Sequence, residues 1–459
     1  MIELDPSKIY EDFTQNLIDK SSAIEKLIVL IENSNNVQVR LNSIKFLEKV
    51  GGDFKNHATM REKVFKLFEN LLISDSNEKI RNIAAKVLGE KFVEISINPL
   101  RWALLHEQSK LCLNTIFKFI IKLVIDLVQV NDRVAKFILL NELKQMVNNE
   151  FKIGFEQLID KGHVNRIPNK ELSLILINYF TLIYLEKSFW RLKYKVKDCK
   201  VIELEFQFKG LIEIPKAVQY LESLRKLILR YNQITTVPKW IKNLKQLEIL
   251  NLNVNSLTGL PESIGSLSHL KVLSLWKNEI ERLPDSFSNL NNLETLNLRL
   301  NQLKELPHDI GYLKSLKELD LHDNKLKALP TSVTQLSSLE KLNLSWNQLQ
   351  SVPISINFLS NLKILDLERN ELSYIPATIG ELKSLENLNL RDNKLLKIPN
   401  TFGSLKNLKY LNLSRNMLDR IPDTLNSLSS LLELNLTDNQ LQNAHSLKNL
   451  EEKGVIIYY

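Results

Sequence analysis

An asparagine recurs every twenty-three residues through the C-terminal part of the chain, and this period constrains the fold more than any other feature. Ten of the thirteen prolines keep the same step, from Pro215 to Pro422. The ten asparagines are Asn232, Asn255, Asn278, Asn301, Asn324, Asn347, Asn370, Asn393, Asn416 and Asn439. Self-similarity at one fixed step is typical of an array of stacked structural units.

The leucines keep the same period and predict the local structure. One unit reads Leu-x-x-Leu-x-Leu-x-x-Asn-x-Leu-x-x-Leu-Pro-x-x-Ile-x-x-Leu. The Leu-x-Leu segment has the period of two that is typical of a strand with one apolar face. After the asparagine the spacing changes to three and four, and the proline prevents a long helix. We therefore expect a short strand followed by an irregular return path or a short helical turn.

A single unit cannot be stable alone. Its seven or eight apolar side chains contribute about 1.5–3 kcal/mol each, whereas ordering each of its residues costs about 1–2 kcal/mol. Stacking is therefore required, and it places the strands side by side in a parallel sheet. The asparagine amide both donates and accepts, so we expect it to satisfy buried backbone groups of its own turn and of the adjoining turn.

This pattern resembles the leucine-rich repeat over residues 201–459. The twenty-three-residue form is similar to intracellular leucine-rich-repeat proteins of the Ras-binding scaffold type, such as the plant intracellular Ras-group-related proteins. The resemblance implies an α/β solenoid: a leucine-rich-repeat horseshoe with a parallel concave sheet. The first unit departs from the pattern with Lys209 at the asparagine position, and the last has Ala444 and His445 at the Leu-Pro position. Residues 455–459 are expected to form a final strand.

Upstream of the repeats the apolar spacing is helical. A segment beginning at Asn36 matches one beginning at Asn77, and Arg40 and Arg81 stand forty-one residues apart. This pairing resembles a HEAT repeat over roughly residues 20–95. Further helices are expected at about 108–130, 133–149 and 170–190. We therefore predict an all-α, partly HEAT-like domain over 1–195, followed by a leucine-rich-repeat array with terminal caps over 196–459.

The formal charge of +8 is largely local. Six basic residues and one acidic residue lie between Lys187 and Lys200, a stretch that we interpret as a solvated helix end and linker. A phosphate-tracking protein needs a basic stripe along a whole face. We therefore expect no nucleic-acid partner.

Other features favour a cytoplasmic protein. Cys112 and Cys199 cannot form a disulfide framework, the start of the chain lacks the order of a signal peptide, and the resemblance to intracellular repeat proteins agrees. The longest uncharged apolar run, from Leu172 to Leu185, is shorter than the roughly 20 residues that cross a bilayer. No transmembrane segment is predicted.

The search for catalytic chemistry identifies no cofactor site, no metal site and no catalytic residue. No phosphate-binding loop, dinucleotide fingerprint or nucleophile elbow occurs. His106 and Glu107 begin a zinc-protease motif, but Lys110 replaces its second histidine. Cys112 is expected to be buried and inert. Cys199 adjoins several lysines, which could lower its pKa.

The face that the leucines leave free is the predicted binding surface. The residue after each Leu-x-Leu forms one column across the array, and the next residue forms a rim column. Tryptophan, tyrosine and arginine dominate binding hot spots, and Trp276 and Trp346 are expected to be exposed. The candidate protein-binding residues are Arg230, Tyr231, Trp276, Arg299, His322, Trp346, Arg369, Arg391 and Arg415. The column between the two leucines, mostly Asn and Asp, is interpreted as generic solvent-facing polarity.

These features predict a non-catalytic scaffold that binds a folded protein on the concave face. By resemblance, the partner could be a small GTPase. One alternative is an enzyme or regulatory enzyme subunit with a site in residues 100–200, where His106, His163, Cys112 and Asp132 would have to converge. A structural repeat that shapes a larger assembly is another. The oligomeric state and the role of the helical domain stay open.

Overall fold

The computed structural model describes residues 5–52, 58–93, 95–130, 133–160, 167–442 and 447–459. The chain divides into two compact units. One comprises residues 1–191 and 196–200, and the other comprises residues 192–195 and 201–459. We call them the helical unit and the repeat unit.

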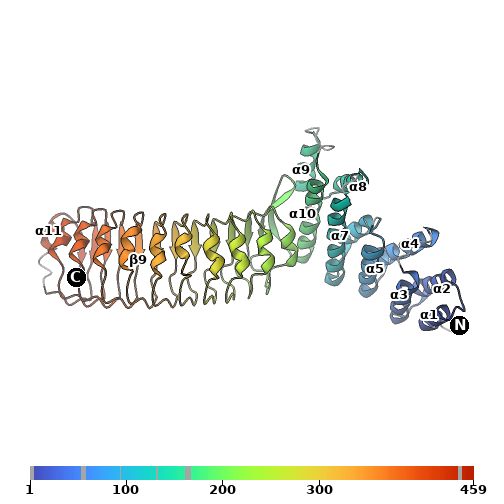
Figure 1. Cartoon of the computed structure of the whole chain (residues 1–459), viewed down its shortest axis with the longest axis horizontal. Helices are drawn as coiled ribbons and strands as arrows, with labels where there is room; N and C mark the ends of the chain where they lie inside the picture. Colours follow the sequence, from blue (N-terminus) through green and yellow to red (C-terminus); the bar gives the residue numbers. More distant parts are fainter. Residues whose placement is uncertain (1–4, 53–57, 94, 131–132, 161–166, 443–446) are drawn as a thin grey trace. The chain divides into compact units, whose positions relative to one another are not determined.

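The helical unit contains ten α-helices in its described ranges (Figure 1). They are α1 (Pro6–Thr14), α2 (Lys20–Asn33), α3 (Val37–Gly51), α4 (Ala58–Ser74), α5 (Glu78–Lys91), α6 (Ile97–His106), α7 (Lys110–Val130), α8 (Arg133–Lys144), α9 (Asn149–Asp160) and α10 (Asn169–Ser188). The N-terminal region is therefore α-helical, as the spacing of its apolar residues predicts.

The two matching segments of the helical unit begin helices in the same way. The side-chain oxygen of Asn36 accepts hydrogen bonds from the first turn of α3, and that of Asn77 accepts them from the first turn of α5. Such N-caps satisfy backbone donors that have no partner within the helix. Arg40 pairs with Asp75, while Arg81 pairs with Glu107 through two bonds of 2.8 and 2.9 Å. The HEAT-like assignment of residues 20–95 stays a prediction.

Two details of the sequence interpretation were wrong. The helix expected at 133–149 ends at Lys144, and a separate helix, α9, follows it. The basic stretch is not a plain linker, because it contains strand β1 (Lys193–Lys197) and opens β2 (Lys200–Glu205). Asp198 and Cys199 connect these strands with φ of 50° and 57°. Two successive left-handed residues are typical of a tight hairpin turn.

The repeat unit is built on a sheet whose strands lie in chain order from β1 to β13 (Figure 1). Each strand from β2 to β13 pairs in parallel with the next. The repeat strands are β3 (Lys226–Ile228), β4 (Ile249–Asn251), β5 (Val272–Ser274), β6 (Thr295–Asn297), β7 (Glu318–Asp320), β8 (Lys341–Asn343), β9 (Ile364–Asp366), β10 (Asn387–Asn389), β11 (Tyr410–Asn412), β12 (Glu433–Asn435) and β13 (Ile456–Tyr458). The register advances by twenty-three residues, so Leu319 lies between Leu296 and Leu342.

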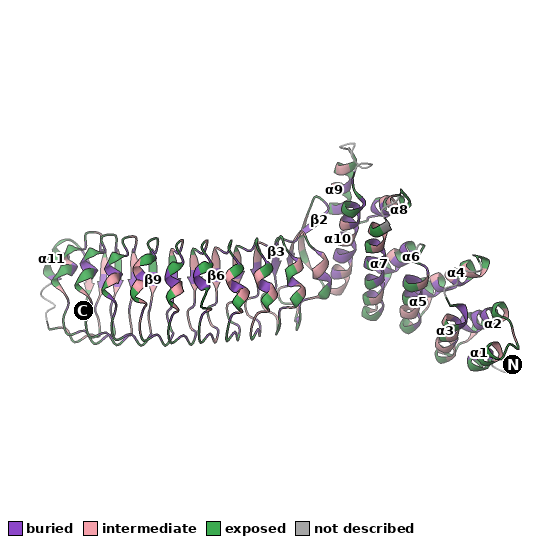
Figure 2. Ribbon diagram, viewed as in Figure 1, coloured by how far each residue is buried: buried purple, intermediate pink, exposed green. Residues whose placement is uncertain are grey.

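The return path of each unit contains a short 3₁₀ helix, as the proline spacing predicts. These helices run from η2 (Lys216–Tyr220) to η11 (Asp423–Ser427), and nine of the ten begin directly after a proline. Leucines from the strands and return paths fill the interior between them, and most are fully buried (Figure 2). We call the side that carries the 3₁₀ helices the return side.

The recurring asparagines perform the predicted task. Nδ2 of Asn301 donates to the carbonyl oxygens of Leu275 and Leu298 at 3.0 and 2.9 Å, while its Oδ1 accepts from the Ile280 N–H at 3.0 Å. The same bonds recur from unit to unit, which ties each turn to the one before it. At the far end, β13 confirms the expected final strand. Ala444 and His445 lie outside the described residues.

Candidate functional site

The exposed side of the sheet, which we call the sheet face, is organised into columns of side chains. Each strand contributes its first and third residues, and the second residue points into the core. The residue two positions after each strand adds a third column, and the next residue adds the rim column. On β7 these four positions are Glu318, Asp320, His322 and Asp323. The strand register aligns the columns across the array, so their side chains are held in fixed order without any ligand.

The second column, formed by the third residue of each strand, has a structural task that the sequence interpretation missed. Asn297 Oδ1 accepts a hydrogen bond from the Arg299 N–H at 3.1 Å, and Asn343 Oδ1 accepts from the Ser345 N–H at 3.1 Å. Asn and Asp side chains commonly satisfy the backbone two residues on in this way. The uniformity of this column therefore reflects the turn that ends each strand, rather than generic polarity.

The rim column is held in the left-handed region of backbone space. The φ angles of its ten residues, from Tyr231 to Asp438, lie between 49° and 58°. This conformation is uncommon for residues other than glycine, asparagine and aspartate. The stacked turns impose it on Trp346 and Arg369, among others, and thereby fix the direction in which these side chains leave the backbone.

The structure places the predicted binding residues on the sheet face and its rim. Arg230, Arg299, Arg415 and Trp346 are exposed. Partly exposed are Tyr231, Trp276, His322, Arg369 and Arg391. Trp276 was expected to be exposed but is only partly so, and its indole Nε1 is buried and has no acceptor among the described residues.

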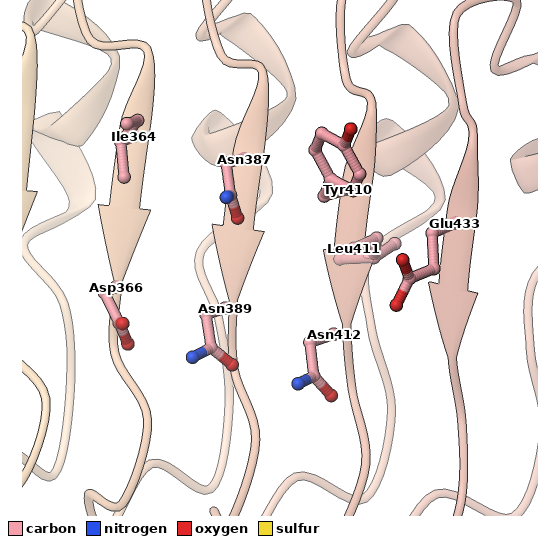
Figure 3. A pocket seen from close by; sticks show the side chains of 8 residues that line it. All are labelled: Ile364, Asp366, Asn387, Asn389, Tyr410, Leu411, Asn412 and Glu433. Atoms are coloured by element: carbon pink, nitrogen blue, oxygen red, sulfur yellow. The ribbon is translucent and has the colours of Figure 1, made fainter. Parts of the chain in front are cut away.

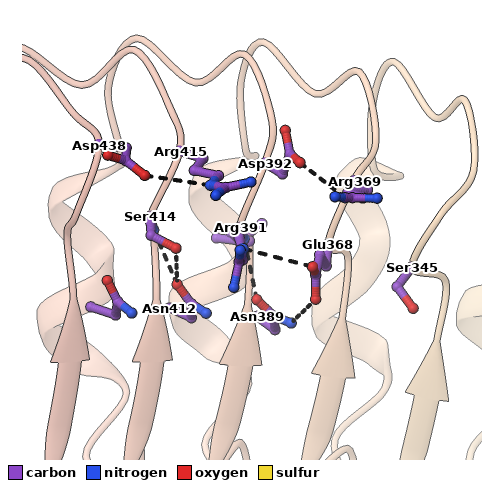
Figure 4. A network of polar contacts seen from close by, with 12 residues as sticks. Ser345, Glu368, Arg369, Asn389, Arg391, Asp392, Asn412, Ser414, Arg415 and Asp438 are labelled. Atoms are coloured by element: carbon purple, nitrogen blue, oxygen red, sulfur yellow. Dashed lines mark hydrogen bonds and ion pairs between the residues drawn. The ribbon is translucent and has the colours of Figure 1, made fainter.

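The arginines toward the C-terminal end are already paired (Figure 4). Arg369 Nε lies 3.0 Å from Asp392 Oδ2, and its guanidinium lies 3.9 Å from the centre of the Trp346 ring. Arg391 Nε lies 3.8 Å from Glu368 Oε1. The network continues at Arg415, whose Nε lies 3.4 Å from Asp438 Oδ2. These partners neutralise the three arginines within the array.

A shallow pocket of about 250 Å³ opens on β9 to β12 (Figure 3). It is lined by Ile364, Asp366, Asn387, Asn389, Tyr410, Leu411, Asn412 and Glu433. Burial raises the pKa of the Asp366 carboxyl. The sequence interpretation missed Ile364 and Tyr410 because it did not consider the first column. Their exposed apolar side chains at strand positions are the signal that could have found them.

His322 occupies the centre of the third column. Its Nδ1 lies 2.7 Å from Ser345 Oγ. Burial lowers the pKa of the imidazole, and the nearby Arg299 lowers it further. The ring is therefore held in its neutral form near pH 7 and can both donate and accept a hydrogen bond.

The helical unit offers a second pocket of about 250 Å³, which His106 lines together with Arg81 and Glu107. Cys112 is not among the described residues that line it. The Cys112 thiol lies 3.1 Å from the Glu78 carbonyl oxygen, and burial raises its pKa to about 11. His163 and Asp132 lie outside the described residues, so the convergence that the enzyme alternative requires stays untested.

The pKa of the Cys199 thiol is not lowered, although the adjoining lysines could have done so. Its side chain is fully buried, and its Sγ lies 3.4 Å from the Phe151 carbonyl oxygen. Burial raises the pKa of the thiol to about 12, and Asp198 adds to this increase. The neighbouring lysines therefore do not activate it.

Searches for two further kinds of feature cover the described residues. Within these ranges, no group of three or more His, Cys, Asp and Glu side chains is placed to hold a metal ion. None of the helices described above combines the length and hydrophobicity needed to span a membrane.

Comparison with known proteins relates the repeat unit to one family. The family described as leucine-rich repeat region matches residues 194–302 and 351–453, and the leucine rich repeat family matches residues 292–349. No curated protein sequence matches the chain.

Two solved structures illustrate the similarity. A leucine-rich-repeat protein of Leptospira interrogans is 30% identical, with a TM-score of 0.36 over 57% of this chain and 86% of that chain. A TDR receptor is 34% identical, with a TM-score of 0.50 over 52% of this chain, which spans 44% of the receptor chain. From its repeats, its parallel sheet and the two family matches, which together cover more than half of its residues, the chain belongs to the leucine-rich-repeat proteins.

Proposed function

We propose that this protein is a non-catalytic scaffold that binds a folded protein partner on the sheet face. One observation carries the proposal: the third and rim columns place tryptophan, tyrosine, histidine and arginine side chains in a fixed register although none of them belongs to the leucine core. Pre-organised side chains lose little conformational entropy on binding, and this favours affinity. Leucine-rich repeats also act generally as protein-interaction modules, with extended binding surfaces built by stacked units.

The proposed contact residues are Arg230, Tyr231, Trp276, Arg299, His322, Trp346, Arg369, Arg391 and Arg415. The testing variant is Trp276→Ala with Trp346→Ala, because these tryptophans offer the largest apolar contact area. Circular dichroism should show an intact fold, while recovery of the partner in a pull-down should fall. A matched control is Ile354→Ala with Phe358→Ala, since these side chains are 76% and 64% exposed on the return side. Undiminished recovery with the tryptophan variant would place the site elsewhere.

A small GTPase is the specific partner that we propose from the resemblance to Ras-binding repeat proteins. The mixed charge of the sheet face supports a folded protein with both acidic and basic surface, rather than a polyanion. The test is a pull-down with purified Ras-type GTPases loaded with GDP or with a non-hydrolysable GTP analogue. Binding that depends on the nucleotide supports the assignment. If neither nucleotide form binds, the tested GTPases are excluded as partners.

We also propose a cytoplasmic location. Both cysteines are free and buried, which suits a reducing compartment, where disulfides are rare. Cell fractionation with an antibody against the chain tests the proposal. Recovery in the cytosolic fraction supports it, and recovery in the medium or in a membrane fraction contradicts it.

A further inference from the structure

The charge of the sheet face is divided along the array. On β3 to β6 the four columns contain four basic and no acidic residues among sixteen described positions, a net of +4. On β7 to β12 the same columns contain four basic and eight acidic residues, with histidine counted as neutral, a net of −4. The first four repeat strands therefore present a separate basic surface, although the columns on β3 to β12 taken together carry no net charge.

The basic residues of this surface differ in whether a carboxylate of the repeat unit pairs with them. Lys226 lies 3.4 Å from both Glu203 and Glu205. By contrast, Arg230, Lys277 and Arg299 form no ion pair with any described residue. Arg230 instead has a neutral partner, since its Nε donates a 2.7 Å hydrogen bond to Gln207 Oε1.

This contrast separates the two groups of arginines. Arg369, Arg391 and Arg415 each have a carboxylate within 3.8 Å. A partner carboxylate that approaches them must compete with a partner already present. Arg230 and Arg299 have no such competing carboxylate, so a partner carboxylate can form a charge-assisted hydrogen bond to either of them without displacing one.

A large aromatic side chain lies between the two unpaired arginines in their column. Trp276 belongs to the same column as Arg230 and Arg299, on the strand next to that of Arg299, and is partly exposed. We call these three residues the basic-apolar patch. A central apolar region edged by charges is the usual composition of a binding hot spot.

The spacing within the patch sets the length of segment that it fits. Arg230 and Arg299 are three repeat steps apart, which is about 14 Å at roughly 4.8 Å per strand. An extended chain rises about 3.4 Å per residue and alternates its side chains between two sides. Residues i, i+2 and i+4 therefore face the same way, and i and i+4 are about 14 Å apart.

Resting on the proposed function, we infer that the basic-apolar patch binds an extended acidic segment of the partner protein. The segment carries Asp or Glu at positions i and i+4, which pair with Arg230 and Arg299. An apolar residue at i+2 packs against Trp276. The acidic remainder of the sheet face repels such a segment, so its position along the array is fixed by charge.

A random twelve-residue peptide library displayed on phage tests this inference against the full chain. The expected consensus is two acidic residues four positions apart with an apolar residue midway. A synthetic peptide of that consensus should bind with an affinity that falls as NaCl is raised. Arg230→Ala with Arg299→Ala should weaken binding at least tenfold. The matched control, Lys304→Ala with Lys394→Ala, removes two exposed cations outside the four columns and should change binding less than twofold.

The outcomes separate the two proposals. A basic or purely apolar consensus, or equal binding by the arginine variant and the lysine control, overturns the assignment of the acidic segment. If binding is instead lost with Tyr410→Ala, the sheet face remains the binding surface but the patch does not. If no substitution on the sheet face changes the binding of the selected peptides, the proposed function is contradicted as well. A single-stranded DNA oligonucleotide that displaces the peptide at equal concentration would assign the patch to phosphate and overturn the inference.

Discussion

Asn324 donates a hydrogen bond from its Nδ2 to the carbonyl oxygen of Leu298, twenty-six residues earlier, at 3.0 Å. The same amide donates to the Leu321 carbonyl and accepts from the Leu303 N–H, each at 3.0 Å. One buried side chain thus satisfies three backbone groups in two successive units. This relationship explains why the asparagines keep a constant spacing of twenty-three residues. Each one must lie at the same place in its unit to reach the backbone of the unit before it.

Replacing Asn324 should therefore be costly. Asn324→Ala leaves the buried Leu303 N–H without its acceptor, and an unsatisfied buried group costs about 1–3 kcal/mol. The carbonyls of Leu298 and Leu321 each lose one of two bonds, because Asn301 and Asn347 also donate to them. We expect a loss of about 1–3 kcal/mol in urea unfolding followed by circular dichroism. Lys325→Ala, at the exposed neighbouring position, serves as the control and should change stability by less than about 0.5 kcal/mol. Similar losses for both variants would contradict the role of the asparagine.

Glu107 should make the helical unit sensitive to acid. Burial alone would raise the pKa of this carboxyl, but Arg81 and the backbone N–H groups of Ser109 and Gln108 outweigh it and lower the pKa from 4.5 to about 2. Because the folded pKa lies below the unfolded one, the stabilisation is complete above about pH 4.5 and is lost as the pH falls toward 2. The shift corresponds to about 3 kcal/mol.

Urea unfolding at pH 6 and pH 3 measures this effect. Glu107→Gln should reduce the difference in stability between the two pH values relative to the parent chain. Glu25→Gln provides the control, since Glu25 is 57% exposed and pairs with the exposed Lys63. An unchanged pH dependence in Glu107→Gln would show that the pair with Arg81 contributes little.

His322 reports on the unpaired Arg299. The imidazole should titrate below its ordinary value of 6.5, because burial and the positive charge of Arg299 both disfavour the protonated ring. Arg299→Ala should raise the midpoint in a nuclear magnetic resonance titration, because Asp320, Asp323 and Asp366 then oppose burial alone. Arg230→Ala, on a repeat four steps away, should leave the midpoint unchanged. A midpoint unaffected by Arg299→Ala would mean that this guanidinium points away from the ring.

The two thiols should be inert in the folded protein. Burial raises the pKa values of Cys112 and Cys199 to about 11 and about 12, and the thiolate is the reactive form. We expect iodoacetamide at pH 8 to alkylate neither within an hour, whereas both should react promptly in 6 M guanidinium chloride. Mass spectrometry of the intact chain counts the adducts. Rapid labelling of the native protein would contradict the burial of these side chains.

The sequence predicts the repeat unit well because its core is periodic. Each leucine position is repeated ten times, so an error at one position would be visible at the others. The interior is buried as predicted, and asparagines such as Asn324 make the predicted bonds. The helical unit lacks this redundancy, which is why α9 was missed and why the strand that begins at Lys193 was interpreted as part of a linker.

The candidate site was less predictable, because its chemistry depends on neighbours one repeat away. Whether an arginine is available depends on the residue twenty-three positions before or after it, as for Arg369 with Asp392. That spacing is visible in the sequence once the register is known. The burial of the Trp276 Nε1 is not, since it depends on the side-chain conformation that packing against the sheet allows.

Site-specific photo-cross-linking tests most directly whether the sheet face binds the partner. A benzophenone amino acid is introduced singly at positions 276 and 346 on the sheet face and at position 358 on the return side, and each chain is irradiated in its native cells. The account predicts one shared protein cross-linked from 276 and 346 and absent from 358. Cross-links from 358 alone, or different proteins from 276 and 346, would contradict it.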